Sequence, residues 1–372
     1  MKCEVIKRNL YVLTVLVLLL GLVLYFGTAP VASAAKPAGW AVVYDGGGEG
    51  VLYDVSAVNI NIAWAVGSNA GSGIMKTTDG GATWQNQYTI GSGSCLFSVS
   101  AVDANTAWAV GGDLILKTTD GGANWVQQYS KPTINLYGVS AVDANTAWAV
   151  VGGLKAAPRT ILKTTDGGST WVRQYSGHSG NLWDVSAVDA DTAFVAGDNA
   201  ILKTTDGGST WMTQHSGTLG WFTSISAVDA NNAWVAGGPV LRTTDGVNWV
   251  VVHPYDPATY FMGISAPNPN TAWATGTGGA IVKTDDGGST WVEEPSGTTS
   301  NLHAVSAVNY KTAWAVGNSA VALRRTGKRP YYACGAGGGA AVVMLGLTLG
   351  LLSVAGSLSI RKRLPMRLQQ VR

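Results

Sequence analysis

Short segments in which apolar and polar residues alternate fill the chain between residues 36 and 333, and turn sequences separate them. A Val/Ile-Ser-Ala motif recurs at intervals of 39 to 46 residues, with its serine at Ser56, Ser100, Ser140, Ser186, Ser226, Ser265 and Ser306. Eight residues after each serine stands a large aromatic residue, namely Trp64, Trp108, Trp148, Phe194, Trp234, Trp273 or Trp314. This spacing is typical of propeller blades, and the alternation predicts an all-β fold.

Each unit is predicted to hold four short strands, a to d. Strand a resembles residues 136–142 and strand b residues 146–150, with an Asp/Asn-x-Asn turn between them. Strand c ends in the block Lys-Thr-Thr-Asp-Gly-Gly-Ala-Thr-Trp at residues 76–84, and strand d starts at its Trp. The block recurs at residues 117–125, 163–171, 203–211 and 283–291, and a shortened copy occupies residues 242–249.

The aspartate of each block is suited to brace a turn, because it can accept backbone N–H groups from the residues that follow it. The two glycines allow positive φ where the chain reverses, and the Trp buries a large ring in the next strand. We therefore expect a structural role, and not that of a catalytic acid, for Asp79, Asp120, Asp166, Asp206, Asp245 and Asp286.

Seven Val-Ser-Ala motifs but only six Asp-containing blocks leave the seventh unit without a strand d. Trp40 stands 16 residues before Ser56, and the Trp of each block stands 15 or 16 residues before the next serine. Tyr44 follows Trp40 by four residues, as a Tyr follows several block tryptophans. We predict a seven-bladed propeller over residues 36–330, in which strands a to c from 301–326 are completed by the N-terminal strand 40–44. Such closure removes exposed sheet edges.

The two ends of the chain differ from this pattern. Residues 1–35 carry basic residues, an apolar run over 10–26 and a small-residue cleavage site at 32–34, which predicts a signal peptide, or alternatively an uncleaved anchor. Residues 331–360 form a Gly-rich linker and a predicted transmembrane helix, and residues 361–372 a basic tail expected in the cytoplasm. The expected location of the propeller is therefore extracytoplasmic, membrane-anchored at the cell surface or periplasmic side.

Charge and cysteine content exclude some classes of function. The segment between the two ends contains 16 Lys and Arg and 21 Asp and Glu residues, so it is acidic although the whole chain has a net charge of +2. A nucleic-acid partner is not expected, because such proteins present a basic face. Three cysteines, Cys3, Cys95 and Cys334, form neither a disulfide framework nor a zinc spacing, so we expect no metal and no cofactor.

Blades reading VSAVDANTAWAVGG and then ILKTTDGGSTW resemble the photosystem II stability and assembly factor family, seven-bladed propellers of the Asp-box (BNR, sialidase-like) group. The resemblance covers about residues 38–327. It implies a binding or assembly role, in which the photosynthetic members use an arginine-rich patch. Here the arginines between the two ends are few and spread over several blades, and Arg324 and Arg325 are the adjacent pair. The segment from Cys334 also resembles a cell-surface sorting signal, with a plain anchor as the alternative.

A mostly aromatic position lies three residues before each motif serine, and it is occupied by Tyr53, Phe97, Tyr137, Trp183, Thr223, Met262 and His303. One interpretation is that these side chains pack between blades, because they share a face with the Val two residues later. The other is an aromatic rim at the channel mouth that holds a peptide or a sugar.

Catalysis is a separate alternative, since a glycosidase needs two facing carboxylates. Asp54 and Asp184 hold the same place on strand a in blades one and four, so a pair across the channel is conceivable, but bracing of loops is the simpler role. We predict a non-enzymatic, monomeric binding or assembly scaffold, with a protein or glycan ligand on the loop face away from the membrane. The alternative is a glycan-binding or glycoside hydrolase (sialidase-like) surface protein.

Overall fold

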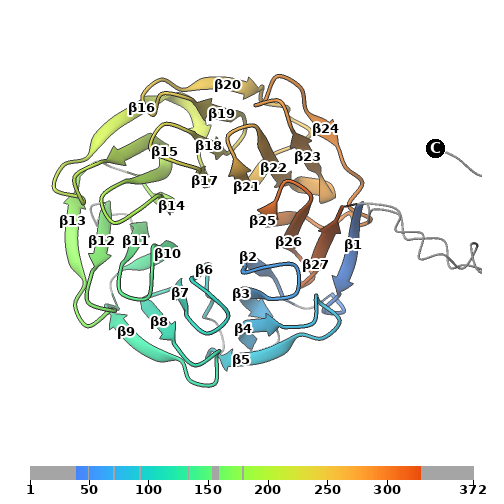
Figure 1. Ribbon diagram of the computed structural model, residues 1–372, viewed down its shortest axis with the longest axis horizontal. Coiled ribbons are helices and arrows are strands. Elements are labelled where there is room, and N and C mark those ends of the chain that lie inside the picture. The colour runs from blue at the N-terminus through green and yellow to red at the C-terminus, as the bar shows by residue number, and fades with distance from the viewer. Residues whose placement is uncertain are drawn as a thin grey trace, which may run out of the picture. The chain divides into compact units, whose positions relative to one another are not determined.

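Strands paired in antiparallel fashion form seven sheets, which stand as blades around a central axis (Figure 1). The computed structural model describes residues 39–327 apart from 49, 70–71, 92–93, 133, 153–158 and 178–179. The predicted all-β, seven-bladed fold is confirmed for this part of the chain. The predicted signal peptide, transmembrane helix and basic tail lie outside the described residues, and within them no helix is long and apolar enough to cross a bilayer.

The first three blades each contain four strands in sequence order from the axis outward. Blade one holds β2 (Leu52–Ala57), β3 (Ala63–Asn69), β4 (Ser72–Thr77) and β5 (Gln85–Thr89). Blade two holds β6 (Ser98–Ala101), β7 (Ala107–Gly111), β8 (Leu114–Thr118) and β9 (Val126–Ser130). Blade three holds β10 (Asn135–Ala141), β11 (Ala147–Gly152), β12 (Thr160–Thr164) and β13 (Val172–Ser176).

The remaining blades follow the same order with local changes. Blade four holds β14 (Leu182–Ala187), β15 (Ala193–Thr204) and β16 (Met212–Trp221). Blade five holds β17 (Ser224–Ala227), β18 (Ala233–Ala236), β19 (Val240–Thr243) and β20 (Val250–His253). Blade six holds β21 (Phe261–Asn268), β22 (Thr271–Gly276), the 3-10 turn η1 (Thr277–Gly279), β23 (Ile281–Thr284) and β24 (Val292–Glu293). Blade seven holds β25 (Leu302–Asn309), β26 (Thr312–Gly317), β27 (Ala322–Thr326) and β1 (Gly39–Tyr44).

Blade four departs from the four strands predicted for each unit. The first half of β15 pairs with β14, and its second half pairs with β16, so this one strand occupies positions b and c. Asn199, midway along β15, has φ of 54°. A positive φ at Asn is typical of tight hairpin turns with a two-residue loop.

The hydrophobic core lies between blades. The aromatic residue on each strand b is fully buried and packs against strands a and b of the following blade. It also meets the block Trp of that blade edge to face, as Trp64 does with Trp125 at 5.6 Å between ring centroids and 86° between ring planes. Edge-to-face packing places the positive ring edge on the negative ring face. Each blade is therefore stabilised mainly by its two neighbours.

The motif serines form a closed ring of hydrogen bonds around the axis. Each serine hydroxyl accepts the backbone N–H of the motif alanine in the next blade at 3.0 Å, beginning with Ser56 and Ala101. The last bond joins Ser306 of blade seven to Ala57 of blade one, also at 3.0 Å. The ring closes after seven members and accounts for the Ser-Ala pair in every repeat.

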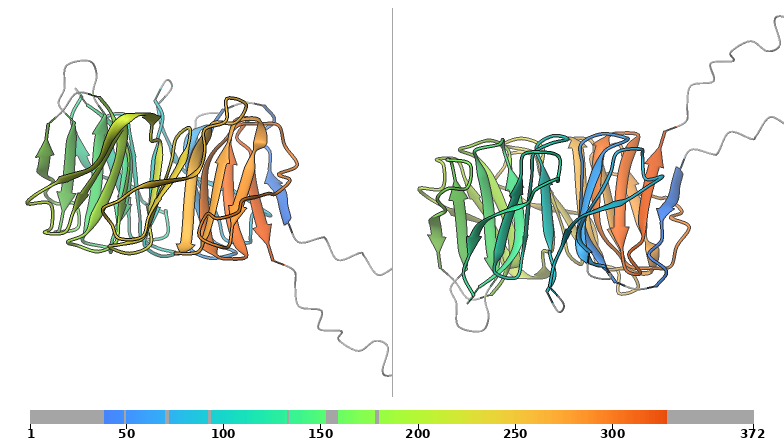
Figure 2. Two further views of the ribbon diagram at one scale, coloured as in Figure 1. Left: turned by 90° about the horizontal axis from the view of Figure 1, so that it is seen from above. Right: turned by 90° about the horizontal axis from the view of Figure 1, so that it is seen from below.

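The Asp-containing blocks are self-contained turns at one face of the propeller. Asp79 Oδ1 accepts the Thr83 N–H at 2.9 Å, and Asp79 Oδ2 accepts the Thr83 hydroxyl at 2.6 Å. These bonds from Thr83 lower the pKa of Asp79 to about 2. Gly80 donates to Asn61 O in the turn between β3 and its preceding strand, so the a–b and c–d turns share one end of the blade. In side view, loops gather at two opposite faces (Figure 2).

The lysine that begins each block links neighbouring blades. Lys76 Nζ donates to Ala104 O at 2.7 Å and to Gly121 O at 2.9 Å in the next blade, and it lies 4.1 Å from the ring centroid of Trp64. Lys117, Lys163 and Lys203 repeat this arrangement. A buried ammonium group is costly unless its protons are paired, so these contacts hold adjacent blades in register.

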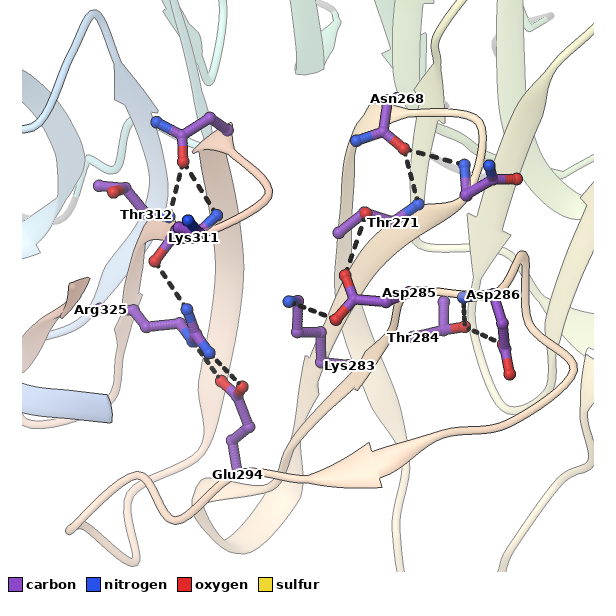
Figure 3. A network of polar contacts seen from close by, with 12 residues as sticks. Asn268, Thr271, Lys283, Thr284, Asp285, Asp286, Glu294, Lys311, Thr312 and Arg325 are labelled. Carbon is purple, nitrogen blue, oxygen red and sulfur yellow. Dashed lines mark hydrogen bonds and ion pairs between the residues drawn. The ribbon is translucent and has the colours of Figure 1, made fainter. Parts of the chain in front are cut away.

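The N-terminal strand β1 pairs with β27 and completes blade seven, so strands from both ends of the propeller lie side by side (Figure 1). Trp40 pairs opposite Arg325 and packs beside Trp273, and its Nε1 donates to Glu294 Oε2 at 2.8 Å. Arg325 binds the same carboxylate through Nε and Nη2, each at 2.6 Å (Figure 3). This network stands where blade seven lacks an Asp-containing block.

Blade six is adapted to the missing block. Lys283 finds no block carbonyl in blade seven, and its Nζ instead binds Asp285 Oδ2 at 2.7 Å (Figure 3). Asp285 replaces the second Thr of the other blocks, and its Oδ1 also accepts the Thr271 hydroxyl at 3.1 Å. Asp285 therefore compensates for the missing block of blade seven.

Removing the closing strand should destabilise the whole ring. A protein that begins at Asp45 loses Trp40 and exposes the edge of β27, whereas one that begins at Lys36 retains both. Loss of a packed Trp costs about 3–5 kcal/mol, a large share of a typical stability of about 5–15 kcal/mol. We expect the shorter protein to melt lower and to be proteolysed from blade seven inward, with partial rescue by a peptide of residues 36–47. Equal, cooperative melting of both proteins would contradict this role of β1.

Candidate ligand-binding site

The aromatic position of each repeat lies on a β-bulge at the start of strand a. In five blades the pairing of strands a and b skips one residue, namely Tyr53, Tyr137, Trp183, Met262 or His303. Leu52 and Val55 on either side are both buried, so the bulge turns Tyr53 and Asp54 away from the core. The expectation from simple alternation, that Tyr53 and Val55 share a face, is therefore wrong. Bulges commonly re-aim side chains in this way.

Five of these side chains form a continuous arc of rings across five blades. Their centroids lie 5.6 Å apart for His303 and Tyr53, and 5.3 Å apart for Tyr53 and Phe97. The separations are 5.2 Å for Phe97 and Tyr137 and 4.8 Å for Tyr137 and Trp183. Strands a line the central opening (Figure 1), so the arc runs around the mouth of the channel at the end where these strands begin. We call these five residues the aromatic arc.

Every ring of the aromatic arc is partly exposed, in contrast to the fully buried aromatic residues of strands b. The rings thus contact one another across blade boundaries and still offer surface to a ligand. The arc ends at blades five and six, where Thr223 and Met262 occupy the position and the Thr223 hydroxyl donates to Met262 O at 3.0 Å. The aromatic arc is therefore a continuous surface that covers five blades of the channel mouth and leaves out blades five and six.

Polar contacts fix both ends of the aromatic arc. Trp183 Nε1 donates to Asp198 Oδ1 at 2.7 Å, and His303 Nε2 lies 2.7 Å from Asn318 Oδ1. Both partners come from the turns between strands b and c, at the same face. An anchored indole or imidazole loses little further conformational freedom on binding, which favours affinity. Sequence reasoning did not find Asp198 or Asn318, because each is 15 residues from its partner and outside the repeat motif.

Asp54 and Asp184 connect neighbouring strands a below the rings. Asp54 accepts hydrogen bonds from the Ser98 hydroxyl and the Val99 N–H of blade two, each at 2.9 Å. It also accepts the N–H of Val55, the next residue in the chain, at 2.8 Å. Asp184 accepts the Ile225 N–H of blade five at 2.9 Å. These are bracing contacts, and they occupy the oxygens that a catalytic carboxylate would present to substrate.

Burial raises the pKa of Asp54 to about 7 and that of Asp184 to about 6, against the hydrogen bonds that lower both. The charge of Asp184 also raises the pKa of Asp54. Both side chains keep some solvent contact but lie deep within the ring, where protein surrounds the carboxyl groups. Desolvation therefore outweighs hydrogen bonding at these two positions.

The other candidate chemistries find no assembled site in the described part of the chain. No group of three His, Cys, Asp or Glu side chains among the described residues could hold a metal ion. The arginines do not converge: Arg242 donates to Gly287 O at 2.6 Å between blades five and six, and Arg325 belongs to the closure network.

The raised pKa of Asp54 makes stability depend on pH. The folded protein keeps a proton up to about pH 7 that the unfolded chain releases near 3.8, so this stabilising contribution is complete below about pH 4 and is lost as pH rises through 7. We expect Asp54→Asn to flatten the decline of the unfolding free energy between pH 4 and 7, measured by urea denaturation. Asp79→Asn is the matched control, because that group titrates near pH 2. An unchanged slope in Asp54→Asn would contradict the assignment.

Residues 33–172 match the family model of the photosynthesis system II assembly factor YCF48. No curated protein matches the chain significantly. Among solved structures, YCF48 bound to D1 peptide is 20% identical, with 78% of this chain and 98% of that chain covered and a TM-score of 0.62. YCF48 from Cyanidioschyzon merolae is 22% identical, with 78% and 99% covered and a TM-score of 0.60.

Enzymes share the fold as well. A GH74 enzyme from Niastella koreensis is 17% identical, with 76% of this chain and 53% of that chain covered and a TM-score of 0.61. At such identities the structural likeness concerns the fold alone. Residues 33–172 are thus similar to the YCF48 family model, and the described part of the chain shares the propeller fold of the two YCF48 structures.

Proposed function

We propose that this chain is a binding or assembly scaffold that holds an extended segment of a protein partner on the aromatic arc. The observation that carries the proposal is the unbroken run of partly exposed rings from His303 to Trp183. Flat rings that are fixed in place offer contact area at little entropic cost, as aromatic residues do at protein interfaces. A related propeller, YCF48, has a solved structure with a bound D1 peptide, which supports the same class of ligand here.

A scaffold role is better supported than hydrolysis. Two facing carboxylates with room for substrate are the minimum for most glycosidases. Asp54 and Asp184 are committed to bonds with the next blade, and their shared place in the ring explains them without a reaction. The aromatic arc has no comparable structural necessity, since Thr223 and Met262 replace the rings in two blades.

We also propose that the propeller is extracytoplasmic, monomeric and tethered to a membrane, with the Asp-containing blocks toward the bilayer. The proposal rests on the apolar segments at the two ends of the sequence and on the place where the propeller ends. Thr326 ends strand c of blade seven, at the face of the a–b and c–d turns. The aromatic arc lies at the opposite face and would point outward. Labelling of cysteines placed at Thr78 and Tyr255 in intact cells tests this, and faster labelling at Thr78 would contradict it.

Trp183→Ala should weaken peptide binding by about tenfold or more while the fold persists. Its ring is half-buried, so we expect a stability loss of about 1–2 kcal/mol, within the usual range for single substitutions. Trp148→Ala is the matched control, since that ring is fully buried and its loss should cost about 3–5 kcal/mol. Binding is measured with the D1 peptide and with a displayed library of random peptides. Full-strength binding by Trp183→Ala, or no peptide bound by the intact protein, would refute the role of the aromatic arc.

A further inference from the structure

A cavity of about 660 Å³ lies beside the aromatic arc, between blades three and four. Its walls come from the start of β12, the end of β13, the hairpin of β15 and both halves of β16. We call it the blade-four pocket, and the residues that define it here are Arg159, Tyr175, Asp198, Thr213, Ser216 and Trp221. The b–c and d–a turns place it on the same face as the aromatic arc.

Trp221 is the unusual wall of this pocket. All 15 tryptophans of the chain lie among the described residues, and Trp221 is the only exposed one, at 63%. The repeat does not require it, because the equivalent residue before the first core position is Val51, Asn135, Asn181 or Asn301 in other blades. Its backbone is held by pairing with Asp198 and by the Tyr260 hydroxyl, which donates to Trp221 O at 3.0 Å. The indole thus faces solvent from an anchored backbone.

Arg159 supplies an unsatisfied donor in the same pocket. The residue is only 3% exposed, and its Nη2 donates to Asp198 O at 2.8 Å. Its Nε has no hydrogen-bond partner in the described structure. Buried polar groups without a partner are costly and rare, so an acceptor oxygen from a ligand would relieve this cost.

The charge balance limits the class of ligand. The Asp198 carboxylate accepts the Trp183 indole N–H and the Asn181 N–H, each at 2.7 Å, and it lines the pocket together with the Arg159 guanidinium, so one acidic and one basic side chain share the walls. The pair leaves the pocket close to neutral. Ser216 and Thr213 add hydroxyl groups to the walls. A site with one aromatic platform, several polar groups and no net charge suits a neutral polyhydroxylated ring better than an anion.

We propose that the blade-four pocket binds a neutral pyranose sugar. The C–H face of the ring would stack on the Trp221 indole, whose π face is electron-rich, and a ring hydroxyl group would contact the guanidinium side of Arg159 that lines the pocket. This site is separate from the peptide surface of the aromatic arc. The two meet only at Asp198, which holds the Trp183 indole on one side and lines the pocket on the other.

The test uses the full chain and two neutral disaccharides, cellobiose and N,N′-diacetylchitobiose, in saturation-transfer NMR, followed by an array of neutral oligosaccharides. We expect saturable binding of at least one neutral sugar. Trp221→Ala should weaken it by about tenfold, equivalent to about 1.4 kcal/mol. Arg159→Lys, which keeps the charge but removes the Nε donor, should weaken it comparably. Tyr255→Ala, exposed but outside the pocket walls, is the control and should not change binding.

The outcomes separate the ligand classes. Absence of binding to every neutral sugar on the array, or binding that survives Trp221→Ala, would overturn the proposal. A preference for acidic sugars or for peptide carboxylates would also overturn it and would assign the pocket to an anion. Peptide capture by the aromatic arc is measured on the same variants, so failure of the sugar site is distinguished from failure of the scaffold role.

Discussion

Seven hydrogen bonds from motif alanines to motif serines join the innermost strands into a closed ring. The rest of the propeller depends on the relative positions of the blades that this ring sets. Each bond contributes only about 1 kcal/mol net. Burial of one aromatic residue of strand b contributes more, since its loss costs about 3–5 kcal/mol. The ring therefore does not supply most of the stability. It fixes the register of each blade against the next, so that six strand b rings reach the block Trp of the following blade and Trp273 packs beside Trp40.

The same register determines the functional surface. In five blades a bulge just before the serine ring turns one side chain toward the channel mouth, and closure brings His303 of the last blade beside Tyr53 of the first. The bond from Ala57 to Ser306 joins the same two blades beside these rings. Where the ring is cut, Trp40, Glu294 and Arg325 replace the interactions of the absent block.

The sequence was sufficient to predict the architecture, because the repeat spacing reflects covalent distances along the chain. It predicted seven blades and the position of β1, and it singled out the aromatic position without deciding between packing and a binding rim. The bulge could not be predicted, since alternation of apolar residues assumes regular pairing. Lys76 binds carbonyl groups 28 and 45 residues further along the chain, and Arg325 binds Glu294 of the neighbouring blade. No local sequence pattern reveals contacts over such separations.

Amide hydrogen exchange with and without a bound peptide tests the central claim most directly, because it reports which face the partner covers. We expect added protection at the starts of β25, β2, β10 and β14 and in the turn that contains Asp198. We expect no change in the Asp-containing turns at the opposite face. Protection confined to those turns, or spread over the outer strands, would contradict a binding surface formed by the aromatic arc.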